Sequence, residues 1–192
     1  MRSGNFQMRL PCHRKPWALV THDRLNLEEP RMQVYDVVED FALENQDGKT
    51  VHLKDYKDSL VVLFFYPRAD TPGCTLESCG FRDIFAKFQK AGIVVLGISR
   101  DTVKEQKKFK DKYELPYDLL ADPEMVLIKR YGLLKDKTMY GKPATSVERT
   151  TYVIGPDKGT GQRLLHIFPK VTPDGHAEEV FKLLKSSLAE KK

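Results

Sequence analysis

Two short apolar runs, residues 60–66 and 93–99, place the strongest constraint on how this chain can fold. Each run is apolar at successive positions, which is typical of a central strand covered on both of its faces. Between them an apolar stripe recurs with the period of a helix, and its members are Phe81, Ile84, Phe85 and Phe88. Gly92 can end that helix. A buried strand, a helix and a second buried strand predict an α/β fold.

The rest of the chain continues this alternation. Asp47-Gly48 inside residues 41–53 predicts a β-hairpin. The expected later elements are a solvated lysine-rich helix over 102–113, a helix that starts at Asp122-Pro123 and stops at Gly132, strands over 150–155 and 163–168, and a closing helix over 177–188. We therefore expect an α/β sandwich with a mixed central β-sheet flanked by helices.

Charge and hydropathy exclude two classes of protein. The net charge of the 192 residues is +5, and residues 1–31 carry six Lys or Arg against three acids, which leaves +2 for the rest. The body of the chain therefore has no strong electrostatic reason to bind nucleic acid. Its longest apolar run is far too short to span a bilayer. Residues 1–32 lack an apolar period, so we expect a disordered N-terminal extension before one domain over 33–192.

The three cysteines indicate a reducing compartment. An odd count in a chain of this size does not suggest a disulfide scaffold, so we expect a cytoplasmic protein, with organelle targeting by residues 1–31 as the alternative. Cys74 and Cys79 lie five positions apart, whereas Cys12 lies in the N-terminal extension. In a reducing compartment such a close pair points to chemistry more than to structure.

The stretch YPRADTPGCTLESC (66–79) predicts a reactive thiol. Thr71 suits the N-cap of a helix and Pro72 its first position, which places Cys74 in the first turn. Unpaired backbone N–H groups and the positive end of the helix dipole favour a thiolate there. The thiolate is the nucleophilic form, so this cysteine is a candidate nucleophile.

Other uses of these cysteines fit the sequence less well. Structural zinc commonly needs two close ligand pairs, and the spacing of Cys74 and Cys79 is wrong for one. A cysteine hydrolase needs a histidine partner, but His166 falls inside a predicted strand. A redox sensor or holdase, in which the two cysteines form a disulfide that signals to a partner, stays open as an alternative.

The run PRADTPGCTLESC resembles the Pro-x-x-x-Thr-x-x-Cys signature of peroxiredoxins, and the second cysteine resembles the peroxiredoxin Q, or bacterioferritin comigratory protein, branch. The similarity continues through GIVVLGISRD, YDLLADPE and ERTTYVIGPD to KVTPDGHAEEV. It covers nearly everything after Met32. The resemblance implies a thioredoxin-like fold and a thiol peroxidase that needs no cofactor and no metal.

The resemblance also implies a role for five residues. Cys74 would attack a hydroperoxide and become a sulfenic acid, and Cys79 would resolve it to an intramolecular disulfide. Thr71 would hydrogen-bond the thiolate and the peroxide, Pro67 would shield the site from water, and Arg149 would stabilise the thiolate. The implied partners are a hydroperoxide substrate and thioredoxin or a similar dithiol reductant, for an enzyme that acts as a monomer without nucleic acid or membrane.

Overall fold

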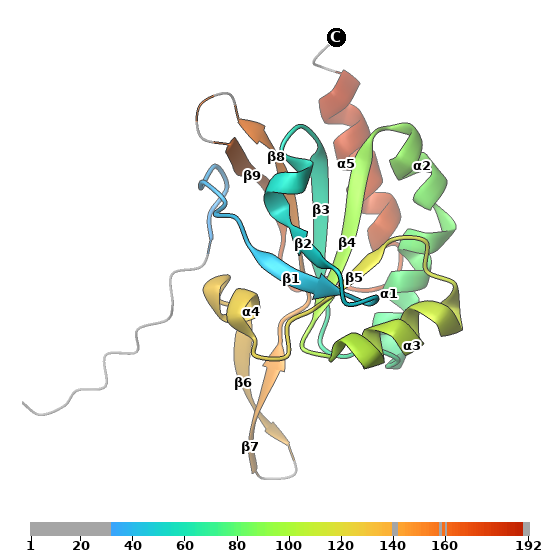
Figure 1. Ribbon diagram of the computed structural model, residues 1–192, viewed down its shortest axis with the longest axis vertical. Coiled ribbons are helices and arrows are strands. Elements are labelled where there is room, and N and C mark those ends of the chain that lie inside the picture. Colours follow the sequence, from blue (N-terminus) through green and yellow to red (C-terminus); the bar gives the residue numbers. More distant parts are fainter. Residues whose placement is uncertain (1–31, 140–141, 158, 160, 190–192) are drawn as a thin grey trace, which may run out of the picture.

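A mixed seven-stranded sheet forms the centre of the computed structural model, which describes residues 32–139, 142–157, 159 and 161–189. The strand order is β2-β1-β5-β4-β3-β8-β9 (Figure 1). Its strands are β1 (Ala42–Asn45), β2 (Thr50–His52), β3 (Leu60–Phe65), β4 (Ile93–Ser99), β5 (Asp118–Ala121), β8 (Thr150–Asp157) and β9 (Gly161–Phe168). The strands β3, β4 and β5 run parallel, and the outer pairs are antiparallel. The predicted mixed α/β sheet is confirmed.

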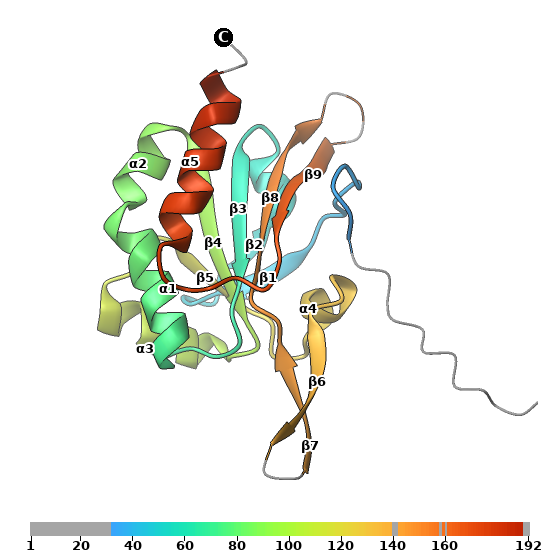
Figure 2. The ribbon, with the colours of Figure 1, turned by 180° about the vertical axis from the view of Figure 1, so that it is seen from behind.

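Helices pack on both faces of this sheet. They are the 3₁₀ helix η1 (Leu53–Tyr56) and the α-helices α1 (Pro72–Asp83), α2 (Phe85–Lys90), α3 (Val103–Tyr113), α4 (Val126–Arg130) and α5 (His176–Ala189). Figure 2 shows α1, α2 and α5 together on one side of the sheet. On that side Phe64 of β3 stacks on Phe81 of α1, whereas on the other side Phe65 packs with Tyr131 after α4. Successive residues of β3 therefore supply two separate apolar cores, as its two-faced run predicts.

Two predicted helices differ in detail from the structure. The apolar stripe of residues 81–88 spans two helices, because Ile84 leaves helical geometry (φ −112°, ψ 12°) between α1 and α2. The break still leaves Phe81 and Phe88 fully buried. The second difference is the helix expected to start at Asp122-Pro123: α4 begins at Val126 instead. The carboxylate of Asp122 nevertheless satisfies its first N–H groups, accepting from residues 126, 127 and 128 at 2.8–2.9 Å.

Several strands were not predicted. The strand β5 is only four residues long, and a separate hairpin of β6 (Leu134–Met139) and β7 (Lys142–Val147) projects from the body beside α4 (Figure 1). Its strands mix charged, polar and apolar side chains without the alternation that marks a half-buried strand. The predicted hairpin at Asp47-Gly48, by contrast, is present as β1 and β2, with Gly48 at φ 73°.

The described chain begins beside the sheet edge. The predicted extension lies outside the described residues except for Met32, and the segment that follows it pairs with β9 through Tyr35 N to Leu164 O (2.7 Å) and Val38 N to Gln162 O (2.9 Å). In the part of the chain that the structure describes, each helix is too short or too polar to traverse a bilayer.

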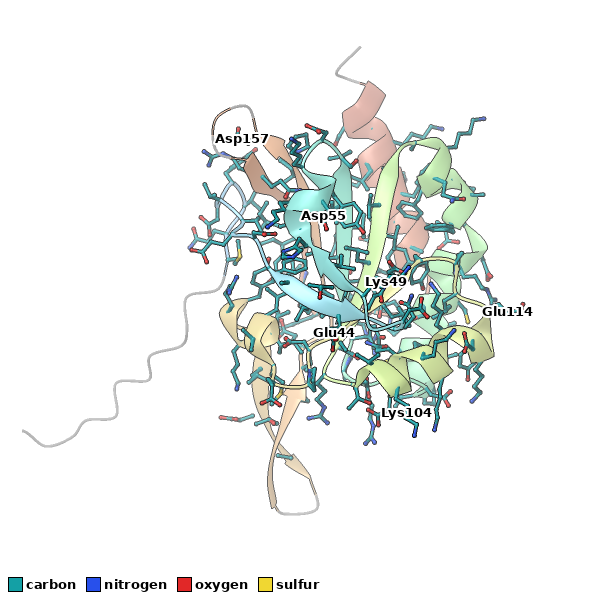
Figure 3. The ribbon with its side chains drawn as sticks, in the orientation of Figure 1. Glu44, Lys49, Asp55, Lys104, Glu114 and Asp157 are labelled. Carbon is teal, nitrogen blue, oxygen red and sulfur yellow. The ribbon has the colours of Figure 1, made fainter. Side chains whose placement is uncertain are left out.

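The lysine-rich helix α3 has the solvated face that its sequence predicts. Its N-cap Thr102 forms a capping box with Glu105, while Gln106 and Phe109 face inward. Lys104 on α3 and Glu114 just after it point away from the body (Figure 3), and both are exposed. Four of its five lysines are exposed, whereas Lys110 is partly buried and its Nζ donates to Tyr117 O.

The core leaves no room for a side chain at Gly97, the fifth of the seven residues of β4. A Cβ atom built there would lie 2.7 Å from Phe64 Cζ and 2.8 Å from Leu119 Cδ2, on the two neighbouring strands. We expect Gly97→Ala to lower the free energy of unfolding by about 1–3 kcal/mol in denaturant titrations, because overpacked cores lose that much. Gly159→Ala is the matched control, because a Cβ atom built at Gly159 would have no atom within 4 Å. This variant should change the free energy of unfolding by less than about 0.5 kcal/mol. Equal values for both variants would contradict the packing argument.

Candidate active site

The candidate nucleophile lies where β3 passes through a short loop into α1. The loop begins at Tyr66, whose N–H donates to Ile98 O (3.0 Å), and ends at Thr71, the N-cap residue of α1 in extended conformation. Pro72 is the first helical residue, and Thr75 N donates to Thr71 O (2.8 Å). Cys74 is therefore in the first turn, as predicted, where backbone N–H groups have no partner within the helix.

The side chain of Thr71 does not cap the helix. Its hydroxyl donates to the carbonyl of Arg68 at 2.9 Å, within the loop. This bond holds Thr71 in a turn next to the helix start and leaves its oxygen lone pairs able to accept. Pro67, in the same loop, is half-buried.

The side chain of Arg149 binds Cys74. The Cys74 side chain is buried with 1% of its surface exposed, and Arg149 Nη2 donates to its Sγ at 3.2 Å. The backbone of Arg149, between β7 and β8, is held by Val171 N, which donates to its carbonyl at 3.0 Å. A methyl group at Gly73 would touch the guanidinium at 3.4 Å, so the cation lies directly over the first turn of α1.

Glu77 completes this arrangement and was not predicted as a site residue. Its carboxylate forms an ion pair with Arg149 Nη1. Burial raises the pKa of Glu77 to about 7, although Arg149 beside it lowers the pKa. Burial lowers the pKa of Arg149 in turn, but Glu77 and Cys74 more than offset that effect and raise it. The sequence signal for Glu77 is its spacing: it lies one helical turn after Cys74 and so on the same side of α1.

The guanidinium of Arg149 therefore binds two side chains of α1 at once. One nitrogen contacts sulfur and the other contacts the Glu77 carboxylate, in a site from which water is largely excluded. A cation held in this way is able to stabilise negative charge on a group placed beside it. The Arg149 side chain is only 14% exposed and is paired with Glu77, so it is not a solvent-facing surface arginine.

Cys79 lies on the same helix, half-buried, and both cysteines are free thiols. In an intact α-helix two residues five apart have Cα atoms ~8.6 Å apart and face different sides. A disulfide needs Cα atoms within about 7 Å. The folded α1 thus keeps the two thiols separate.

The structure brings the predicted site residues into one region of the molecule. Pro67 and Thr71 lie in the loop before α1, Cys74 and Cys79 lie on α1, and Arg149 lies over its first turn. His166, the partner required for a hydrolase, lies on β9 with its ring against Phe168. Among the described residues no group of three or more His, Cys, Asp or Glu side chains is placed to hold a metal ion.

The raised pKa of Glu77 predicts a pH dependence of stability. Because the folded protein holds this proton more tightly than the unfolded chain, the stabilising contribution is complete below pH 4.5 and is lost as the pH rises to about 7. Glu77→Gln cannot titrate. Its free energy of unfolding relative to wild type should therefore rise by on the order of 3 kcal/mol across that window, at 1.36 kcal/mol per pH unit. Denaturant titrations at several pH values measure this, and parallel curves would show that folding does not raise the pKa of Glu77.

Comparison with known proteins shows the family of this chain. The family model for the AhpC/TSA family matches residues 34–160. The chain is 46% identical over 140 residues to a putative peroxiredoxin bcp of Coxiella burnetii, covering 73% of this chain and 90% of that protein. It is 38% identical to peroxiredoxin Bcp of Bacillus subtilis, covering 76% and 90%.

Solved structures extend the similarity to the fold. The crystal structure of a Xylella fastidiosa PrxQ mutant superposes with a TM-score of 0.76 at 32% identity, covering 83% of this chain and 99% of that one. A Xanthomonas campestris bacterioferritin comigratory protein gives a TM-score of 0.71 at 32% identity, covering 77% and 91%. The fold is thioredoxin-like, as the resemblance implied. On these similarities, this chain belongs to the AhpC/TSA family and, within it, to the peroxiredoxin Q/bacterioferritin comigratory protein branch of thiol peroxidases.

Proposed function

We propose that this peroxidase reduces hydrogen peroxide and organic hydroperoxides by a two-cysteine cycle in which Cys74 is the nucleophile. The observation that carries the proposal is the contact of 3.2 Å between Arg149 Nη2 and Cys74 Sγ in a buried first helical turn. The Cys74 thiolate attacks the terminal oxygen of the hydroperoxide and the O–O bond breaks. The products are a sulfenic acid on Cys74 and an alkoxide or hydroxide that takes a proton to become alcohol or water.

The neighbouring side chains have distinct roles in this step. Arg149 stabilises the thiolate and the charge that develops on oxygen. The Thr71 oxygen, fixed by its bond to Arg68 O, accepts a hydrogen bond from the peroxide, and Pro67 limits the access of water. Glu77 holds the guanidinium in place by binding its other nitrogen.

In the second step Cys79 attacks the sulfur of the sulfenic acid, which releases water and forms the Cys74–Cys79 disulfide. A dithiol reductant of the thioredoxin type then reduces this disulfide by thiol exchange. Because the folded α1 holds the cysteines too far apart, the helix must unwind locally, and Ser78 and Gly80 are weak helix formers in that region. Both cysteines belong to one helix, so the disulfide can form within one chain, and we propose that the enzyme is a monomer. We further propose that it works in a reducing compartment such as the cytoplasm.

The first test is the nucleophile. Cys74→Ser should abolish peroxide consumption in an assay with thioredoxin, its reductase and NADPH, because serine cannot form a sulfenic acid. Arg149→Ala should slow the peroxide step by about 10²–10³-fold, the usual cost of a lost charge-stabilising donor. Comparable turnover by Cys74→Ser would refute the assignment. Disulfide formation in the wild type without turnover would favour the redox-sensor alternative.

The second test is the resolving step. In Cys79→Ser, mass spectrometry should find sulfenic acid at Cys74 that passes to sulfinic acid under excess peroxide. In the wild type, amide exchange across residues 75–82 should speed up on oxidation while residues 61–65 of β3 stay protected. Equal exchange in both redox states would refute local unwinding. A disulfide between Cys74 and Cys12 would refute the role of Cys79.

A further inference from the structure

The loop that carries Pro67 and Thr71 is tied to the body of the protein at its middle. The N–H of Ala69 donates to Asp101 Oδ2 at 2.7 Å. Asp101 lies just beyond the end of β4, and only 5% of its surface is exposed. A buried carboxylate that accepts from a backbone N–H makes one of the stronger hydrogen bonds found in proteins.

A chain of buried hydrogen bonds holds Asp101 itself. The Ser99 hydroxyl donates to the same Oδ2 at 2.6 Å, and Asp101 N donates to Ser99 Oγ at 3.2 Å. Ser99 Oγ also accepts from Gln106 Nε2 at 2.9 Å, and Gln106 Oε1 accepts from the Tyr66 hydroxyl. This chain of hydrogen bonds thus starts at Tyr66, the first residue of the loop, and ends at the backbone N–H of Ala69 in the same loop.

This network has one fixed direction of hydrogen bonding. Burial raises the pKa of Tyr66, so its hydroxyl remains a donor at neutral pH. Gln106 is fully buried, and its Nε2 also donates to Leu120 O at 2.9 Å. Each of these donors has an acceptor within the network or on β5. Low local dielectric strengthens such a fully satisfied network and makes it specify one geometry.

We propose that Asp101 is a positioning residue for the peroxide step. Through its hydrogen bond to the backbone of Ala69, Asp101 fixes the positions of Pro67 and Thr71 relative to Cys74. The inference rests on the function proposed above. Asp101 forms its hydrogen bonds with Ser99 and Ala69. It therefore acts on the loop that receives the peroxide and not directly on the sulfur of Cys74.

The expected effect is specific to the oxidant. Misplacing reacting groups by about 1 Å can cost 10²-fold in rate, so Asp101→Ala should slow Cys74 oxidation by hydrogen peroxide by about 10–100-fold. Alkylation of Cys74 by iodoacetamide needs the thiolate but no peroxide-binding loop. Its rate should stay within about twofold of wild type, because Arg149 is untouched.

The experiment measures both rate constants on the reduced full-length protein, with mass spectrometry of the Cys74 peptide as the readout. Asp122→Ala is the matched control, because Asp122 is a buried carboxylate at the end of the adjacent strand β5 that binds backbone N–H groups of α4 instead of the loop. Its ratio of peroxide rate to iodoacetamide rate should equal that of wild type. Asp101→Asn keeps an acceptor for Ala69 N–H and should restore most of the peroxide rate.

Ser99→Ala provides a second test where Asp101→Ala does not fold. It removes one hydrogen bond to Asp101 and should lower the peroxide rate by about 2–10-fold with the iodoacetamide rate unchanged, the worth of a single hydrogen bond. An unchanged ratio in the Asp101 and Ser99 variants, or an equal fall in both rates, would overturn the inference. Slow oxidation of Cys74 in the wild type would instead overturn the proposed function.

Discussion

The hydrogen bonds of one guanidinium hold this site together. Arg149 lies immediately before β8 and binds both Cys74 and Glu77, which lie one turn apart on α1. A thiol and a carboxylate of the same helix thereby share one cation in a largely buried site. The raised pKa of Glu77 is the cost of burying a carboxylate there. The same contact fastens α1 to the sheet, so the reactivity of the thiol and the packing of its helix have a common origin.

The helix that carries both cysteines meets two opposing requirements. In the proposed cycle, attack on peroxide requires a folded first turn under Arg149, whereas the disulfide requires that turn to open. Stabilising contacts include the hydroxyl of Tyr117, which donates to Ser78 O at 2.7 Å. The buried Ser78 Oγ is a destabilising feature of the same helix, because it has no hydrogen-bond partner among the described residues. An orphaned hydroxyl of this kind lowers the cost of opening the helix, because water can satisfy it in the unwound state.

The sequence predicted those features that depend on local patterns. The two-faced runs at 60–66 and 93–99 became the central strands, and Thr71-Pro72 marked the start of α1. Glu77 was missed because the contact that makes it part of the site is with Arg149, 72 positions away, and no local pattern records that contact. The start of α4 was misplaced because Asp122 satisfies the helix N–H groups from outside it. Tertiary contacts, which a single sequence does not display, account for both errors.

The two halves of the site are anchored in different parts of the fold, and this separation matters for the cycle. The loop is held through Ala69 and Asp101 by the end of β4, and Asp70 is held by Lys112 and Tyr113 of α3 at 2.7–2.8 Å. None of these bonds involves residues 75–80, the segment that the proposed cycle requires to unwind. In that cycle, opening the helix would break the bond from Thr75 N to Thr71 O but would leave the anchors at Ala69 and Asp70 intact. Once the proposed disulfide is reduced, α1 would refold against a loop that is still anchored, so ordering of the helix alone would restore the geometry of the site.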